Sequence, residues 1–387
     1  MSDTLVLRLF GERWRVDLDR YADPDAHLAR LRQLWSRVVD DADGDIDVVF
    51  RPDPDGSESL LAPYLADRTD GSFPYAFSRA VTQAAIDRHA GTALLLHAAG
   101  LVSDDGRRGV VLVASSGTGK STAARRLGQR LGYLSDELMM IDEREELRGL
   151  TKPISLIVKD FPGGKDESSP DELHLGPTPL APPRLAALAC LSRTQDAAQP
   201  RLDRISVHDL IAEVVPQTSS LWRVDHPLQR LARAALRGGG PFRLSYAEIV
   251  DAEPLVRGLL EAEPTPDGSQ EWIEHLPSEA QCWRGATETA TAGGFGEDAV
   301  ILRAPWTDAI EQDGEVSVLA GPAFTRIAGI AATIWLACAR PLTVAELGDE
   351  LAREHGPHPE ADALVQAALQ ELGQRDLIDI VLVGVVL

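Results

Sequence analysis

The sequence predicts a multidomain α/β (α+β) protein with three folded parts. Its 387 residues suffice for two or three domains at roughly 150 residues per domain. A glycine-rich loop at residues 114–122, between an apolar strand and a helix, predicts an α/β core that binds phosphate. A strand, a hairpin, three helices and a last strand follow one another within residues 298–387, which predicts a winged-helix-like module.

Residues 1–85 predict a small α+β module at the N-terminus. Alternating apolar and polar residues indicate strands at 5–10 and 14–18, and helical spacing of leucines indicates a helix over 25–39. A third strand is expected at 46–50, before a turn rich in proline and aspartate. We assign no chemistry to this module.

Residues 86–262 predict the nucleotide-binding core. Apolar runs at 93–102 and 109–114 around a polar turn indicate a hairpin, followed by a helix over 121–128 and a strand over 133–141. The other elements expected in the core are a helix at 77–89 leading into it, helices at 207–214 and 227–236, and a strand at 242–246.

Residues 263–297 are expected to be a linker, because they begin with acidic residues, proline and glycine. The module at 298–387 should then open with a strand at 299–303 and a hairpin turned at Asp313-Gly314. The elements expected after it are helices at 324–339, 343–354 and 362–372, the second with a capping box at Thr343 and Glu346, and a strand at 378–387.

Composition excludes several classes of protein. Hydrophobic residues make up 44% and charged residues 25%, values typical of globular proteins rather than disordered or collagen-like chains. The net charge of −22 makes contact with nucleic acid or an anionic membrane through the general surface unfavourable. Because we find no membrane-spanning stretch, no signal peptide and no cysteine pattern for metal, we expect a cytoplasmic protein with reduced thiols.

The glycine-rich loop carries the strongest chemical signal. Glycines let backbone amides turn toward phosphate oxygens, Lys120 can bridge the outer phosphates, and the Ser121 hydroxyl can ligate Mg²⁺. Ala114 stands where the usual pattern has its first glycine, so that turn must suit an L-residue. The alternative is a glycine-rich loop without a ligand. The expected nucleotide-binding residues are Ser115, Ser116, Gly117, Thr118, Gly119, Lys120, Ser121 and Thr122.

Two further groups are expected beside this loop. If the hairpin folds about residues 105 and 106, Ala114 faces His97, although His97 could equally be a core histidine. Asp136 and Glu137 interrupt an apolar strand sixteen residues after Lys120. Burying carboxylates in such a strand costs folding free energy unless they hold a metal, accept a proton, or lie in solvent at the end of the strand.

Lysine is distributed unevenly along the chain. The sequence has thirty-four arginines but only four lysines, Lys120, Lys152, Lys159 and Lys165, all in one window. Either codon bias left these four by chance, or the window needs compact ammonium groups to meet phosphate. Lys152 and Lys159 are therefore candidates for a peptide or phosphate contact.

The core resembles the HPr kinase family, whose P-loop core is shared with the phosphoenolpyruvate carboxykinases, and more closely the HPr-kinase-related proteins of bacterial peptide-modification clusters. The resemblance covers about residues 75–260 and lies in His97, the loop ending Gly-Lys-Ser at Ser121, and Ser135-Asp136-Glu137. It implies that Asp136 is a general base or metal-linked acid and that His97 lies at the phosphate site. Ser121, Asp136 and Glu137 would be metal ligands, and Lys120 would join Asp136 and His97 in catalysis. The family usually has a second aspartate where this chain has Glu137.

Residues 298–380 resemble PqqD-like peptide-recognition domains. The resemblance rests on Ala331-Ala332-Thr333-Ile334-Trp335, on 342–347 and on 369–372. Such domains bind the leader of a ribosomally made precursor as a strand added to a sheet edge beside a helix. In this chain the helix would be 362–372. The expected peptide-binding edge is Glu315, Val316, Ser317, Val318 and Leu319. The alternative of a DNA-reading winged helix conflicts with nine acidic side chains against two arginines in residues 341–387.

Together, the two resemblances imply an ATP- and Mg²⁺-dependent kinase that phosphorylates a Ser or Thr hydroxyl on a ribosomally synthesised precursor peptide. Its partners would be that peptide and other maturation enzymes, with no nucleic acid and no membrane. Two alternatives stay open: a non-catalytic, nucleotide-gated protein that delivers the peptide to another enzyme, and a sensor kinase acting on a folded protein.

Overall fold

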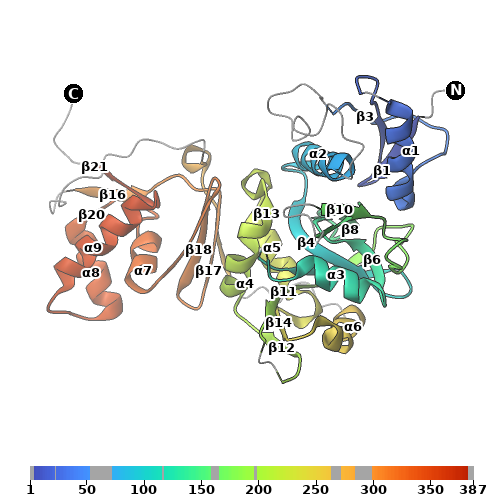
Figure 1. Cartoon of the computed structure of the whole chain (residues 1–387). Coiled ribbons are helices and arrows are strands. Elements are labelled where there is room, and N and C mark those ends of the chain that lie inside the picture. Colours follow the sequence, from blue (N-terminus) through green and yellow to red (C-terminus); the bar gives the residue numbers. More distant parts are fainter. Residues whose placement is uncertain are drawn as a thin grey trace. The chain divides into compact units, whose positions relative to one another are not determined.

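A computed structural model shows how these segments fold (Figure 1). It describes residues 4–21, 23–52, 72–115, 117–157, 165–195, 198–262, 272–283 and 299–381. Its contacts divide the chain into two units, the first formed by residues 1–221 and 234–266 and the second by residues 222–233 and 267–387. Within the described ranges, no helix is long and apolar enough to cross a membrane.

The N-terminal part of the first unit has the predicted α+β composition. Strands β1 (Leu5–Leu9) and β2 (Glu12–Val16) pair antiparallel, and β3 (Val48–Phe50) joins β2 in parallel. Helices α1 (Pro24–Leu34) and α2 (Ser72–His89) cover this sheet. Their apolar side chains form one cluster that also takes in Leu95, Leu138, Met140 and Leu150, so this part shares its core with the central sheet.

The central sheet of the first unit is mixed, with the order β12-β14-β11-β5-β4-β7-β8, and β6 and β13 both pair with β4. The longest strand, β11 (Arg184–Arg193), lies parallel to β5 and to β14 and is buried along most of its length. The other strands of this sheet are β4 (Leu94–Val102), β5 (Arg108–Val113), β6 (Gly132–Ser135), β7 (Leu138–Ile141), β8 (Leu147–Gly149), β12 (Arg201–Arg204), β13 (Thr218–Ser219) and β14 (Phe242–Tyr246).

Helices complete the first unit. Helix α3 (Lys120–Gly128) and helix α6 (Glu253–Glu261) bury their apolar faces in one cluster with β4, β5 and β11. A separate two-stranded sheet pairs β9 (Ile154–Ile157) with β10 (Lys165–Ser168). Helix α4 (Val207–Val214) has Ser206 as its N-cap, and the Ser206 side chain accepts from the amide of Asp209. Helix α5 (Pro227–Leu236) begins in the second unit, which includes residues 222–233, and ends in the first.

The β4–β5 hairpin has the predicted register. Ala98 pairs with Val113 and Val102 with Gly109, so the next pair along the ladder would be His97 with Ala114. The turn is closed by Ser103, whose amide bonds the carbonyl of Arg108 at 2.8 Å. The hairpin therefore brings His97 to the start of the phosphate loop.

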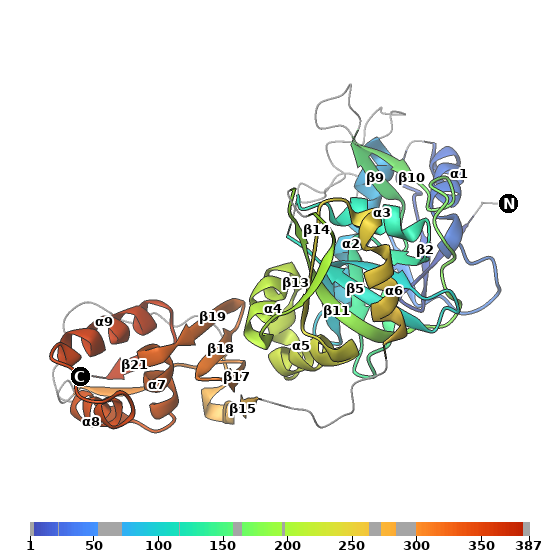
Figure 2. The ribbon, with the colours of Figure 1, turned by 90° about the horizontal axis from the view of Figure 1, so that it is seen from below.

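In the described residues, the second unit contains the start of α5 and, from residue 272 on, two small sheets and the helices α7, α8 and α9, which Figure 2 shows. One sheet has the order β15-β17-β18-β19 and the other the order β20-β16-β21. Helices α7, α8 and α9 pack around the buried Trp335 and Leu369. The elements are β15 (Ile273–His275), β16 (Val300–Arg303), β17 (Asp308–Gln312), β18 (Glu315–Ala320), β19 (Ala323–Ala328), α7 (Gly329–Ala337), β20 (Leu342–Thr343), α8 (Val344–His355), α9 (Ala361–Gln374) and β21 (Ile378–Val381).

Two predicted elements of this unit differ from the structure. The helix expected over 324–339 is a strand, β19, followed by the shorter helix α7. The first half alternates between exposed and buried side chains and pairs with β18, so the hairpin outweighs the helical spacing. Within the predicted linker, β15 pairs with β17. The capping box of α8 is confirmed, because Thr343 and Glu346 bond each other's backbone amides.

Candidate functional site

The glycine-rich loop at residues 114–122 joins the end of β5 to the start of α3. Gly117 and Gly119 have φ angles of +84° and +94°, a region that glycine adopts without strain. A Cβ on either residue would meet no atom within 4 Å, so glycine is needed for its conformation rather than for space. Ala114 is buried and is not among the residues with positive φ, so alanine suits its place in the turn.

Backbone amides at the start of α3 face the loop. The amide of Thr118 donates to the carbonyl of Ser115 at 3.3 Å, and its hydroxyl donates to the same oxygen, which closes the turn. Gly119 is the N-cap of α3 and offers no side chain to bond the first-turn amides. These amides and the helix dipole favour an anion there. Ser121 and Thr122 are exposed in the same turn, and Ser116 lies outside the described residues.

Lys120 and His97 are brought together as the register predicted. The Nζ of Lys120 donates to the carbonyl oxygen of His97 at 2.8 Å. Burial lowers the pKa of Lys120, against the opposing effect of Glu137 and Asp136. Burial and then the charge of Lys120 lower the pKa of His97, so its imidazole is neutral at pH 7. The lysine thus lies between the loop and the carboxylates.

Asp136 and Glu137 break the predicted strand instead of lying within it. The break separates β6 from β7 and is held by Ser135, whose hydroxyl donates to the carbonyl of Leu150 and accepts from the amides of Glu137 and Leu138. The carbonyl of Glu137 in turn accepts from the amide of Ala98 at 3.2 Å. Both carboxylates therefore leave the strand beside β4, next to the loop.

Asp136 is only 5% exposed. Tyr133 donates to its Oδ1 at 3.3 Å, and the nearby Ser121 lowers the pKa of the carboxyl. Burial raises the pKa of Asp136, and Lys152 opposes this while Glu137 adds to it. A carboxyl with a raised pKa next to a phosphate loop has the properties of a proton acceptor.

Glu137 is held by a lysine rather than left open toward the loop. Its Oε2 lies 2.7 Å from the Nζ of Lys152, a residue only 3% exposed. Burial alone would raise the pKa of Glu137, but the charge and hydrogen bond of Lys152 outweigh it, so the pKa is lowered. Burial alone would lower the pKa of Lys152, but the charges of Glu137, Asp136 and Glu167 outweigh it, so the pKa is raised overall.

The third carboxylate of this cluster, Glu167 in β10, was missed by the sequence analysis. It is 1% exposed and accepts from Ser78 of α2 at 3.1 Å and from Ser155 of β9. Burial raises the pKa of Glu167, and Lys152 and the two serines oppose that rise. Residues 165–168 belong to no helix or strand that the sequence predicts, and the only sequence signal near Glu167 is the cluster of lysines. Lys159 lies outside the described residues.

The oxygen donors fit a magnesium ion only in part. The hydroxyl of Ser121 and the carboxylate of Asp136 are hard ligands close enough for Ser121 to lower the pKa of Asp136, and Mg²⁺ commonly uses one or two protein oxygens plus phosphates and water. Glu137 would first have to leave Lys152. Within the described ranges, no group of three or more His, Cys, Asp or Glu is placed to hold a metal ion.

The predicted peptide-binding edge is wrong, because β18 lies inside its sheet. Glu315–Ala320 pairs with β17 on one side and with β19 on the other, so its backbone groups are already bonded. In the part of the chain that the structure describes, β19 has a strand on one side only. The sequence predicts a helix over residues 324–339, so it does not indicate β19 as the second partner of β18. A peptide strand added at this end of the sheet would therefore pair with β19, not with β18.

Comparison with known families gives one match in the second unit. Residues 318–378 match the family model described as Coenzyme PQQ synthesis protein D (PqqD). The matched range runs from β18 through β19 and the three helices to the first residue of β21. A PqqD domain at the C-terminal end is thus confirmed.

Comparison with solved structures gives a weaker match. Among solved structures, the HPr(Ser) kinase/phosphatase from Coxiella burnetii matches with 14% identity over 42% of this chain and 93% of its own, at a TM-score of 0.23. A TM-score this low establishes neither fold nor activity. No curated protein sequence matches the chain.

Proposed function

We propose that the chain is an ATP-dependent kinase that phosphorylates a Ser or Thr hydroxyl on a ribosomally synthesised precursor peptide. The observation that carries the proposal is the meeting of Lys120, Ser121 and Asp136 at the N-terminus of α3. A phosphate loop, a hydroxyl for magnesium and a carboxyl with a raised pKa are the parts that phosphoryl transfer requires.

Each residue has a separate role in this proposal. The loop amides and Lys120 bind the β- and γ-phosphates, and for this Lys120 exchanges the carbonyl of His97 for a phosphate oxygen. Asp136 orients the acceptor hydroxyl and takes its proton. Magnesium held by Ser121, with Asp136 beside it, would neutralise charge on the transferred group. Lys152 keeps Glu137 in place and sets the charge around Asp136.

The PqqD domain supplies the choice of substrate. PqqD-like domains bind precursor leaders as an added strand, and the β18–β19 hairpin offers β19 as the strand to extend. We therefore propose that the leader pairs with β19, while the core segment of the same peptide reaches Asp136.

The test combines the purified chain, ATP, Mg²⁺ and the precursor peptide encoded beside its gene, with mass spectrometry of the peptide. We expect the mass gain of one phosphate with the wild type and none with Lys120→Ala or Asp136→Asn. An Arg126→Lys variant, changed at an exposed position of α3, should retain activity as a matched control. A peptide of unchanged mass with the folded wild type would refute the kinase.

One observation favours a second candidate, a nucleotide-gated protein that recognises the peptide without modifying it. Glu137 is already neutralised by Lys152, which leaves fewer free carboxylate oxygens for magnesium. This version predicts tight nucleotide binding, peptide binding that depends on nucleotide, and no turnover of ATP.

A further inference from the structure

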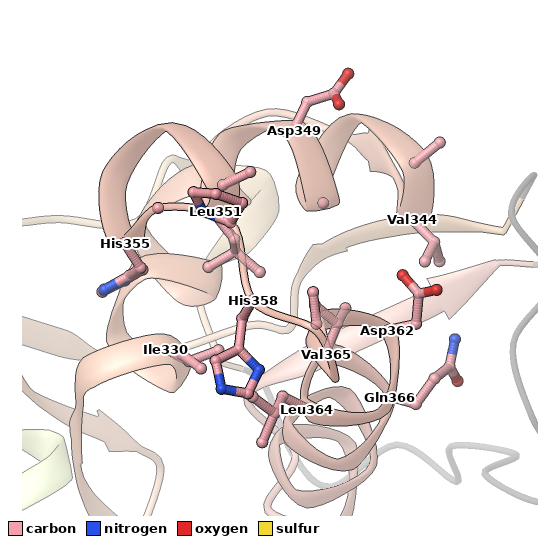
Figure 3. Close-up of a pocket in the computed structure, with 16 residues that line it drawn as sticks. Ile330, Val344, Asp349, Leu351, His355, His358, Asp362, Leu364, Val365 and Gln366 are labelled. Carbon is pink, nitrogen blue, oxygen red and sulfur yellow. The ribbon is translucent and has the colours of Figure 1, made fainter.

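The PqqD domain contains a cavity of about 590 Å³ between α8 and α9 (Figure 3). Its apolar lining comes from Val344 and Leu351 of α8, Leu364 and Val365 of α9, and Ile330 at the start of α7. Leu364 is 39% exposed, a large fraction for a leucine that lines a cavity between two helices. The volume lies within the range of sites that bind a ligand or a few side chains.

Helix α8 leaves this cavity open through a glycine. Gly348 lies in the middle of α8 and lines the cavity, although glycine weakens a helix interior. A Cβ on Gly348 would meet no atom within 4 Å, so no neighbour requires glycine at this position. The absent side chain widens the space between the two helices. A larger residue at Gly348 would therefore fill the cavity without displacing the backbone.

The charged carboxylates of Asp349 in α8 and Asp362 in α9 line the cavity, and the surrounding residues 341–387 carry nine acidic side chains against two arginines. Its other polar lining residues are His355, His358 and Gln366. The Nδ1 of His358 accepts from the amide of Glu360 at 3.1 Å. An apolar space with acidic groups around it complements an apolar side chain next to basic ones.

We propose that this cavity binds an apolar side chain of the precursor peptide that is flanked by Lys or Arg. The inference rests on the proposed function and adds a second subsite to it. None of the cavity's lining residues belongs to β19, so strand addition and side-chain recognition are separate contacts. Backbone pairing at β19 gives affinity for many sequences, whereas the cavity selects the peptide by one anchor and its neighbouring charge.

The test uses fluorescein-labelled 15-residue windows that tile the precursor peptide encoded beside the gene, and fluorescence anisotropy with the full chain. Gly348→Leu fills the cavity and Gly348→Ala serves as the matched control. We expect Gly348→Leu to lower the affinity for the tightest-binding window by about tenfold or more, as loss of a buried anchor does. We expect Gly348→Ala to change this affinity little. Circular dichroism and thermal melts of both variants show whether each is folded.

A second pair of variants tests the charge. Asp349→Asn combined with Asp362→Asn should lower the affinity for windows in which Lys or Arg flanks the apolar residue, and should reduce the salt dependence of their binding. Equal affinity of wild type and folded Gly348→Leu overturns the cavity as a subsite and leaves strand addition at β19 standing. Binding of no window by the wild type removes the proposed peptide recognition and this subsite together. Concentration-dependent self-association that Gly348→Leu abolishes would show a second copy as the occupant and overturn the proposal.

Discussion

The Nζ of Lys152 lies 2.7 Å from the carboxylate of Glu137, and the same ammonium acts on Asp136 and Glu167. One buried lysine thus compensates three carboxylates beside the phosphate loop. The arrangement separates the two neighbouring acids into Glu137, which is ion-paired, and Asp136, which accepts from the hydroxyl of Tyr133.

Removing that lysine should destabilise the first unit strongly. Lys152→Met leaves the buried Glu167 and the half-buried Glu137 without a counter-charge, and the loss of one partner of a buried ion pair typically costs about 3–5 kcal/mol of unfolding free energy. The double variant Lys152→Met/Glu137→Gln should recover part of this loss, because it removes one uncompensated charge. Denaturant unfolding of both variants measures the difference. A single variant as stable as the wild type would mean that the cluster is not compensated through Lys152.

The pH dependence of phosphorylation should follow the charges around Asp136. A base must be deprotonated, so activity should rise with pH through the pKa of Asp136, which burial holds above its usual range. Glu137 raises that pKa and Lys152 lowers it. Glu137→Gln should therefore move the acidic limb of the pH–rate profile to lower pH, and Lys152→Gln should move it to higher pH. Shifts in the same direction for both variants would exclude Asp136 as the titrating base.

The sequence predicted the elements of this site that depend on local pattern. Strand, glycine turn and helix lie next to one another in the chain, so the glycine-rich loop between β5 and α3 could be placed directly, whereas its binding of phosphate stays a prediction. The position of His97 followed from counting residues on either side of one hairpin turn. The pairing of Ala98 with Val113 confirms that count.

The parts that sequence reasoning missed depend on contacts between distant segments. Glu167 reaches Lys152 only because β10 pairs with β9 and packs on α2, and nothing local to residues 165–168 indicates burial. The sequence predicts a helix over residues 324–339, and only pairing with β18 shows that the first part of this stretch is a strand. For the same reason the sequence predicts β18 at an edge of its sheet.

Peptide binding should be visible in the backbone of β19. If the leader adds a strand there, amides of β19 that face away from β18 should exchange more slowly with solvent when the peptide is bound. Amides of β18 are already paired on both sides and should change little. Hydrogen exchange followed by mass spectrometry, with a scrambled peptide as control, measures both. Protection at β15 instead of β19 would place the peptide at the opposite end of the sheet.

Asp308 of the second unit should make local stability depend on pH. It is fully buried, accepts from the amides of Leu228 and Gln229 in the first turn of α5, and burial raises its pKa to about 6. Because the folded state binds this proton more tightly than the unfolded state, stability falls as pH rises from about 4 to about 6, by roughly 3 kcal/mol at most.

Asp308→Asn should abolish that slope while keeping an acceptor for the amide of Leu228. Asp313→Asn, in the exposed turn of the same hairpin, is the matched control and should keep the slope. Exchange of the Leu228 amide, corrected for the intrinsic pH effect, reports the local free energy of opening. An identical pH slope in wild type and Asp308→Asn would rule out this carboxyl as its source.

The central claim, that the loop between Ala114 and Thr122 binds the polyphosphate of a nucleotide, is tested most directly by isothermal titration calorimetry. Mg²⁺-ATP should bind the wild type at a single site and should bind folded Lys120→Ala far more weakly, because that variant lacks the ammonium between the loop and the carboxylates. Folded wild-type protein that gives no heat with Mg²⁺-ATP or Mg²⁺-GTP, and no rise in melting temperature with either, would contradict the account.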